Sequence, residues 1–412
     1  MTFFASRWVE PPRHVRELDP AALPKGFRAG GVAAGIKPSG NLDVGVLVCD
    51  SDDAVSAARF TSNARVGAPV MVSRQARLSE LRAVVANSGC SNVGDGERGI
   101  ETALATQAAV GSELGIDVDR VGVASTGVIG TELPRDKVVH GAHEACRGLG
   151  DDAGAFSEAI LTSDSGPKRA CLEVILPAGE VRLAAQAKGA GMISPRFATM
   201  FCFVETDARL AAETLELLTG VTVKRSFDRI SVDGQLSTSD TVFAIAGGAS
   251  GVEVEPESAD ELALGEALDA LLRQLAMQIV ADGEGAGRVG RIVVNGRPDA
   301  VEPVARAVAD SPLVKAALHG GDPNFGRVLQ AAGQVWPPGE QFVADLEIEG
   351  RTVVSAGNAL ELAADELGEL EAAVQGDEVE YALTIPGDGG ETEVFFSDLS
   401  EEYVTFNSAY TT

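Results

Sequence analysis

The segment at residues 188–207 places the strongest local constraint on this chain. It opens with Lys188-Gly-Ala-Gly, reaches Ala198-Thr199, and then passes directly into the apolar run Met200-Phe-Cys-Phe-Val204. Glycine permits tight turns and close backbone approach. A glycine-rich segment that ends at a threonine, just before an apolar run, is well placed to present that threonine as a concealed nucleophile.

Cleavage of the chain before Thr199 would give this residue both a side-chain hydroxyl and a free α-amino group. An α-amino group has a reference pKa of about 7.7–8.0, so it could accept the hydroxyl proton within the same residue. The pairing of threonine with an N-terminal amine is an established way to activate a weak oxygen nucleophile. Thr199 is therefore the first candidate for catalysis.

Charge and length limit the class of protein. The chain has 412 residues, of which 45% are hydrophobic, which allows two domains or one large α/β domain. Thirty-three basic and 61 acidic residues give a net charge of −28, which would repel a phosphate backbone and excludes nucleic-acid binding. Only seven of the basic residues are lysine, a pattern that fits either a high-salt cytoplasm or a GC-rich coding bias.

Cysteine, histidine and hydropathy patterns indicate a cytosolic protein without a metal site. The five cysteines are far apart and include no CxxC pair, which fits a reducing compartment. The four histidines are scattered, and the spacing of His140 and His143 lacks a carboxylate motif, so we expect no metal and no bound cofactor. No run reaches about 18 apolar residues and the N-terminus has no apolar signal core, so we expect no membrane segment and a cytoplasmic location.

The order of apolar runs predicts an α/β fold. Buried strands are expected at residues 44–49, 81–86 and 121–124, helices at 99–114 and 208–218, and a long helix after the capping-box pattern Ser258-Ala-Asp-Glu261. A soft boundary is expected near residues 290–300, followed by a smaller C-terminal α/β lobe at 297–412. Within that lobe, strands at 379–385 and 391–396 flank Pro386-Gly-Asp-Gly-Gly390 and are expected to pair as a hairpin.

Three short segments could supply chemistry besides Thr199. Ser125-Thr-Gly-Val-Ile-Gly130 follows a predicted strand, where the Thr126 hydroxyl and Gly127 N–H could face one oxygen as an oxyanion hole requires; alone it also fits a simple turn. The glycines around Glu284 could present its carboxylate to a pocket, although a helix C-cap fits equally well. Lys188 could meet a substrate carboxylate or lie on the surface.

Taken together, these segments resemble the ornithine acetyltransferase family, the ArgJ-type bifunctional glutamate N-acetyltransferases of arginine biosynthesis. The similarity runs in order across nearly the whole chain. Its motifs are Gly26-Phe-Arg-Ala-Gly-Gly-Val-Ala-Ala-Gly-Ile-Lys37, Phe60-Thr-Ser-Asn63, Asn87-Ser-Gly89, Ser125-Thr-Gly-Val-Ile-Gly130, Thr162-Ser-Asp-Ser-Gly-Pro-Lys168, residues 188–200, Ser237-Thr-Ser-Asp240, Asp282-Gly-Glu-Gly-Ala286, His319-Gly-Gly-Asp-Pro-Asn324 and residues 403–412.

The resemblance implies a layered α/β fold of the family's own type in a precursor that cleaves itself between Ala198 and Thr199. The products would be an α chain, 1–198, and a β chain, 199–412, assembled at least as α2β2. Thr199 would be the nucleophile and its amine the base, with Thr126 and Gly127 as the oxyanion hole. The residues implied to hold substrate are Thr162, Lys188, Thr199, Glu284, Asn407 and Thr412.

The implied reaction moves an acetyl group from N-acetylornithine to glutamate through an acetyl-threonine ester, by a ping-pong route. Acetyl-CoA is a possible further cosubstrate. Two alternatives stay open: a self-cleaving amidase or aminopeptidase that uses water as acceptor, and a non-catalytic binding protein on the same scaffold.

The chain departs from the family pattern at several positions near the motifs, which leaves the exact substrate preference open. The departures are Ser194, Arg196-Phe197, Gln235 and Gly287-Arg288.

Overall fold

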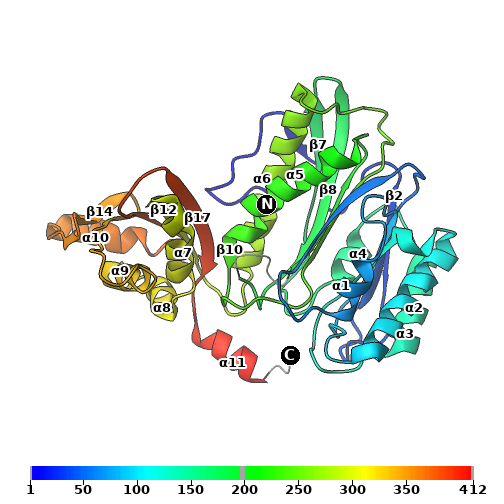
Figure 1. Cartoon of the computed structure of the whole chain (residues 1–412), viewed down its shortest axis with the longest axis horizontal. Coiled ribbons are helices and arrows are strands. Elements are labelled where there is room, and N and C mark those ends of the chain that lie inside the picture. The colour runs from blue at the N-terminus through cyan, green and yellow to red at the C-terminus, as the bar shows by residue number, and fades with distance from the viewer. Residues whose placement is uncertain (1, 195–199, 410–412) are drawn as a thin grey trace.

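The computed structural model describes residues 2–194 and 200–409. They form a body of two stacked β-sheets covered by helices, and a smaller lobe with a third sheet at the left of Figure 1. This arrangement confirms the predicted layered α/β fold with a smaller C-terminal α/β domain. The predicted cleavage pair Ala198 and Thr199, and the predicted substrate ligand Thr412, lie outside the described residues.

The larger sheet of the body has six strands and carries helices α5 (Ala212–Arg225) and α6 (Ala259–Ala281) on its outer face. Alternation along the strands assigns the faces: Cys202 and Val204 face the helices, whereas Phe201 and Phe203 face the second sheet. In spatial order the strands are β1 (Val15–Glu17), β7 (Lys168–Leu176), β8 (Gly179–Lys188), β9 (Phe201–Thr206), β11 (Thr241–Ala246) and β4 (Val55–Phe60).

The second sheet has four strands, and its outer face is covered mainly by helices α2 (Gly96–Leu114) and α3 (Arg135–Arg147). The short helix α1 (Ala68–Ser73) also belongs to this layer and packs beside β6. The short helix α4 (Gly154–Ala159) packs against β2 and β3 on the opposite face, between the two sheets. In order the strands are β2 (Phe27–Val32), β3 (Val44–Cys49), β5 (Ala83–Asn87) and β6 (Val121–Ser125).

An aromatic core joins the two sheets of the body. Phe203 of β9 packs edge-on against Phe156 of α4, with ring centroids 5.0 Å apart, and lies 6.3 Å from Phe243 of β11. These rings are fully buried, and aromatic pairs in such geometries add to the free energy of apolar burial. The body is therefore a four-layer stack of helices, sheet, sheet and helices, visible from α6 to α3 in Figure 1.

The lobe has its own apolar core around strand β12. Its four helices are α7 (Pro298–Ala309), α8 (Pro312–Gly320), α9 (Phe325–Gly333) and α10 (Ala364–Ala373). Its strands, in spatial order, are β10 (Ile230–Ser231), β17 (Gly390–Ser397), β12 (Val289–Gly296), β16 (Glu378–Thr384), β13 (Asp345–Ile348), β14 (Arg351–Ser355) and β15 (Asn358–Ala359). Because β10 comes from the body and pairs with β17, the two parts share this sheet.

The predicted hairpin between residues 379–385 and 391–396 is wrong. Both strands form, but β12 lies between them, parallel to β16 and antiparallel to β17. The glycine-rich loop crosses the end of β12 at very close range, since a Cβ atom on Gly390 would lie 2.7 Å from the Cα of Pro298. The turn-forming residues therefore belong to a loop that crosses a buried strand. Local turn chemistry does not distinguish such a loop from a tight hairpin turn.

Most other predicted elements are present. Residues 44–49 form β3, and the predicted helix at 99–114 is α2, which begins three residues earlier. The Ser258 hydroxyl caps α6 by accepting the N–H of Glu261. The helix predicted at 208–218 begins at Ala212 because Arg209 instead forms a β-bridge with Glu253.

Helix α11 (Glu401–Ala409) returns from the lobe toward the body (Figure 1). None of its residues with a described side chain is buried. Its polar contacts with Asp233 and Glu284, described below, hold it beside the body. The C-terminal segment is therefore placed against the body by a few specific side chains.

Candidate active site

One cavity brings together the predicted site residues that the structure describes. It has a volume of about 250 Å³ and lies where the ends of β6 and β8 approach the end of α6 and helix α11. Its lining residues are Thr126, Gly127, Thr162, Ser163, Lys188, Gly191, Met192, Asp233, Gln235, Leu236, Glu284, Tyr403 and Asn407.

The Thr126–Gly127 turn follows β6 directly. The Thr126 N–H donates to the carbonyl of Asn87, 2.9 Å away, and fixes the turn against the neighbouring strand β5. Gly127 has a φ of +121° and packs so closely that a Cβ atom would lie 2.5 Å from the carbonyl carbon of Gly89. Only glycine fits both conditions. Among the described residues, no acceptor takes the Gly127 N–H, which leaves it available at the cavity.

Lys188 is the last residue of β8, and its ammonium group is buried at the base of the cavity. Its Nζ donates to the Thr126 hydroxyl oxygen over 3.1 Å, and only 2% of the residue is exposed. An ammonium group has no acceptor, so the Thr126 oxygen must accept this bond and keeps its own hydrogen to donate elsewhere. Lys188 thereby orients the Thr126 hydroxyl as a donor.

Asp164 supplies much of the negative charge that faces this buried lysine. Burial lowers the pKa of Lys188, while the charge of Asp164 acts in the opposite direction. Burial alone would raise the pKa of Asp164, but the charges of Lys188 and Lys168, together with hydrogen bonds, hold it well below its usual range. Asp164 therefore stays ionised at neutral pH, and its negative charge favours the charged form of Lys188.

Hydrogen bonds from Asp164 organise the cavity wall. Its carboxylate accepts the N–H of Gly189 over 2.6 Å and the N–H of Thr162 over 3.0 Å, and it pairs with Lys168 over 2.7 Å. Lys168 in turn reaches Asp282 at the end of α6, which also accepts the Ser165 hydroxyl. This network ties the predicted ligand Thr162 to Lys188.

Glu284 lies at the opposite wall, in the turn that follows α6. Its backbone N–H donates to the carbonyl of Ala190 over 2.9 Å, and its carboxylate accepts the Ser163 hydroxyl over 2.6 Å and the Asn407 amide over 2.9 Å. A side chain at Gly191 would collide with this carboxylate at 2.6 Å. The glycine-rich turn thus presents Glu284 to the cavity.

Asp233 and Tyr403 also line the cavity, and sequence reasoning assigned no specific role to either. The Asp233 carboxylate accepts the N–H groups of Met192 and Ile193 at 2.7 and 2.8 Å, and the Tyr403 hydroxyl at 3.4 Å. Burial raises the pKa of Asp233. The only sequence signal for Asp233 was its place in a polar turn after a short strand. The segment that its carboxylate contacts, Met192–Ile193, lies about 40 residues earlier in the chain.

Asp240 fixes the chain where it enters β9. Its carboxylate accepts the N–H of Met200 over 3.0 Å, and the Met200 carbonyl accepts the N–H of Thr241 over 3.2 Å. The next residue, Phe201, pairs across the sheet with Lys188. Met200, which follows the predicted nucleophile in the sequence, is therefore held beside the strand that supplies Lys188.

A model of the ArgJ family matches residues 28–412. The chain belongs to the ArgJ family. It is 42% identical to the arginine biosynthesis bifunctional protein ArgJ of Rhodopirellula baltica over 95% of this chain and 96% of the relative, and 40% identical to that of Nitratidesulfovibrio vulgaris over 95% and 99%. A solved ornithine acetyltransferase from Mycobacterium tuberculosis, complexed with ornithine, is 33% identical, covers 45% of this chain and 99% of that one, and has a TM-score of 0.41.

The described residues of this ArgJ-family member contain neither a metal-binding group nor a membrane-spanning helix. Within residues 2–194 and 200–409, no three histidine, cysteine or acidic side chains form a group suited to a metal ion. In the same ranges, no helix combines the length and hydropathy that crossing a membrane requires.

The environment of Gly127 generates a stability prediction. We expect Gly127→Ala to lower the thermal unfolding midpoint, because alanine would add the cost of positive φ, about 1–2 kcal/mol, and a backbone collision of about 1–3 kcal/mol. Gly130→Ala is the matched control, since Gly130 also has positive φ but no atom lies within 4 Å of its added Cβ. Equal losses in the two variants, measured by calorimetry, would contradict the packing described here.

Proposed function

We propose that this protein transfers the acetyl group of N2-acetyl-L-ornithine to L-glutamate in arginine biosynthesis. The observation that carries the proposal is the convergence of Thr126, Gly127, Lys188 and Glu284 on one cavity, with Lys188 paired to Phe201 shortly after the proposed nucleophile. Membership of the ArgJ family supports it, as do the names of relatives that match nearly the whole chain.

The first half-reaction would use Thr199 as the nucleophile. Its hydroxyl oxygen attacks the acetyl carbonyl carbon while its α-amine takes the hydroxyl proton. The tetrahedral intermediate then collapses: the C–N bond breaks, the proton passes from the amine to the leaving nitrogen, and ornithine departs. Thr199 is left as an acetyl ester with a neutral amine.

The second half-reaction would reverse these steps with glutamate. The α-amino nitrogen of glutamate attacks the ester carbonyl carbon, the C–O bond to Thr199 breaks, and the threonine oxygen regains a proton. In both halves, negative charge develops on the acetyl oxygen. The Thr126 hydroxyl and Gly127 N–H would stabilise that oxygen, and Lys188 would increase the donor strength of Thr126.

The cavity also suits the charges of its proposed substrates. Ornithine and glutamate each carry an ammonium group and a carboxylate. Glu284 and Asn407 would bind the ammonium end, and Lys188 has N–H donors beyond the one given to Thr126 with which to meet a carboxylate. Thr162 and Thr412 complete the proposed set of substrate ligands.

Formation of the nucleophile would require self-cleavage. In this proposal, the Thr199 hydroxyl attacks the Ala198 carbonyl carbon, the peptide C–N bond breaks, and water hydrolyses the resulting ester. The products are an α chain, 1–198, with a new carboxylate, and a β chain, 199–412, with a free amine. We further propose that two of each assemble as α2β2 in the cytoplasm.

Acetyl-CoA is a second proposed acetyl donor. A cavity of about 900 Å³ adjoins the candidate active site and shares Thr162 with it. Gly89 and Val128, which flank the Thr126–Gly127 turn, line this larger cavity. It offers room for a long thiol leaving group that the smaller cavity lacks. The relatives' description as bifunctional supports a second activity.

Intact-mass measurement tests the covalent route. We expect purified protein to yield two fragments that begin at Met1 and Thr199, and the second fragment to gain one acetyl group when incubated with N-acetylornithine. Acetyl-CoA in place of N-acetylornithine should give the same adduct if it is also a donor. The Thr199→Ala variant should stay intact and unlabelled.

The outcomes separate the alternatives. Addition of glutamate should remove the acetyl group and form N-acetylglutamate. If the acetyl group is instead released as acetate at the same rate with and without glutamate, the protein is an amidase. An uncleaved wild-type chain that gains no acetyl group would overturn the proposed nucleophile and favour a binding protein.

The charge of Asp164 generates a pH prediction for the transferase. Asp164→Asn removes the largest of the charges that raise the pKa of Lys188, so burial is opposed only by Asp240 and Glu284 and this pKa falls further. We therefore expect the alkaline limb of kcat/KM to move to lower pH. Asp282→Asn is the control, because Asp282 pairs with Lys168 at the other end of the same network. An unchanged alkaline limb in Asp164→Asn would contradict the role given to Lys188.

A further inference from the structure

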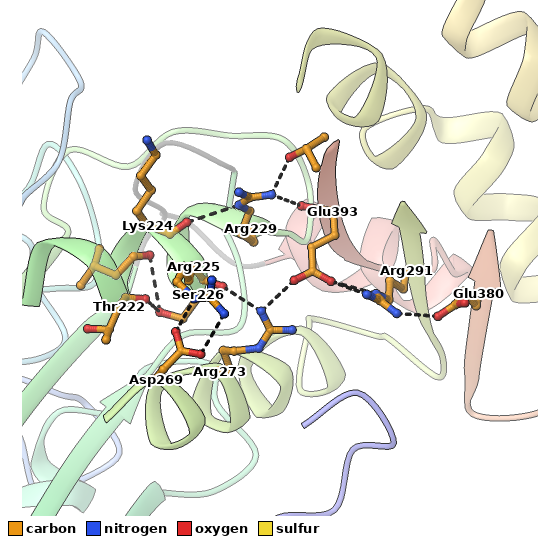
Figure 2. Close-up of polar contacts among 12 residues, drawn as sticks. Thr222, Lys224, Arg225, Ser226, Arg229, Asp269, Arg273, Arg291, Glu380 and Glu393 are labelled. Carbon is orange, nitrogen blue, oxygen red and sulfur yellow. Dashed lines mark hydrogen bonds and ion pairs between the residues drawn. The ribbon is translucent and has the colours of Figure 1, made fainter. Parts of the chain in front are cut away.

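A second polar cavity lies at the junction of the body and the lobe. Its volume is about 430 Å³, and it is lined by Arg225, Arg229, Arg273 and Arg291. These come from the end of α5, the short helix at Phe227–Arg229, α6 and β12. Figure 2 shows Arg229, Arg273 and Arg291 around Glu393 of β17, and Arg225 beside Asp269.

Only some of these four guanidinium groups are paired with carboxylates. Glu393 bridges Arg273 and Arg291, each at 2.7 Å, and Asp269 pairs with Arg225 at 2.8 Å. Glu380 meets Arg291 from the far side (Figure 2). The cavity wall itself holds four guanidinium groups but only two carboxylates, Glu391 and Glu393.

Arg229 is the arginine of this set without a carboxylate partner in the described part of the chain. Its bonds go to neutral oxygens: the Thr392 hydroxyl and the carbonyls of Lys224 and Glu393. Its remaining nitrogen, Nη2, makes no hydrogen bond within the described part of the chain and is not fully buried. The same holds for Nε and Nη2 of Arg273, which bonds through Nη1.

Arg229 also lines a neighbouring cavity of about 330 Å³, which shares Thr392 with the first. The other charged residues of that cavity balance, since Lys224 and Arg306 are matched by Asp228 and Glu302. The whole chain carries a net charge of −28, so a wall with more guanidinium groups than carboxylates runs against its charge balance. Planar guanidinium groups with free donors suit oxyanions, which they bind through paired hydrogen bonds.

We propose that this cavity binds a small multivalent oxyanion, bearing phosphate groups or several carboxylates, through Arg225, Arg229 and Arg273. Ornithine and glutamate are unsuited to it because their ammonium groups would face these arginines. The ligand would contact both the body and the lobe. The site is thus distinct from the proposed catalytic cavity, and its occupancy would strengthen the docking of the lobe.

Calorimetric titration and thermal unfolding of the full chain test the site. The probes are pyrophosphate and citrate, with sodium chloride at matched ionic strength as the reference. We expect saturable binding and a rise in unfolding temperature beyond the salt reference. The key variant is Arg229→Gln, which removes the unpaired charge and should weaken binding by about tenfold or more.

The matched control is Arg147→Gln, which removes an exposed arginine paired with Glu113 and Glu144 on a different face of the fold and should bind as the wild type does. Binding of pyrophosphate alone would identify a phosphate-bearing ligand, and binding of citrate alone a polycarboxylate. Either result, or both, supports the site if Arg229→Gln weakens it. No saturable binding beyond the salt reference, or equal binding by Arg229→Gln, would overturn the proposal. The readout needs no acetyl transfer, so it stands or falls separately from the proposed function.

Discussion

A charged lysine buried beside a hydroxyl group is the constraint on which the candidate site depends. Removing Lys188 from water disfavours its charge, and the nearby carboxylate of Asp164 offsets that cost. Because Lys188 can only donate, it turns the Thr126 hydroxyl into a donor toward the cavity. The proposed oxyanion hole therefore depends on the charge pair of Lys188 and Asp164, although neither of these two groups needs to contact the acetyl oxygen.

The fold explains how these groups meet although they are far apart in the sequence. The two sheets of the body are held together by an aromatic core, and Thr126 and Lys188 lie at the ends of strands in different sheets. Glu284 comes from the turn after α6, and Asn407 from α11 beyond the lobe. The lobe therefore contributes to the cavity through the chain that leaves it, so correct docking of the lobe is a condition for a complete site.

Local patterns predicted much of this arrangement. The capped start of α6 and strand β3 are readable from spacing and residue type. The segments around Thr126, Lys188 and Glu284 also fitted a simple turn, a surface position or a helix C-cap, and the family resemblance singled them out. Six predicted site residues line one cavity. Strand order and contacts between distant parts of the chain could not be predicted from these patterns. The insertion of β12 between β16 and β17 depends on burial of β12, not on the turn sequence. The roles of Asp164 and Asp233 depend on which distant N–H groups and charges their carboxylates face. Thr199, Ala198 and Thr412 stay sequence-based predictions.

The most direct test is a double-mutant cycle on kcat for acetyl transfer, with Lys188→Met and Thr126→Val made singly and together. The proposed contact between Lys188 and a substrate carboxylate acts mainly on KM, whereas its effect on the chemical step passes through the Thr126 hydroxyl. Lys188→Met should therefore lower kcat in the wild type but add little once Thr126 is valine. Fully additive losses would contradict this account, because they would mean that the two residues act independently.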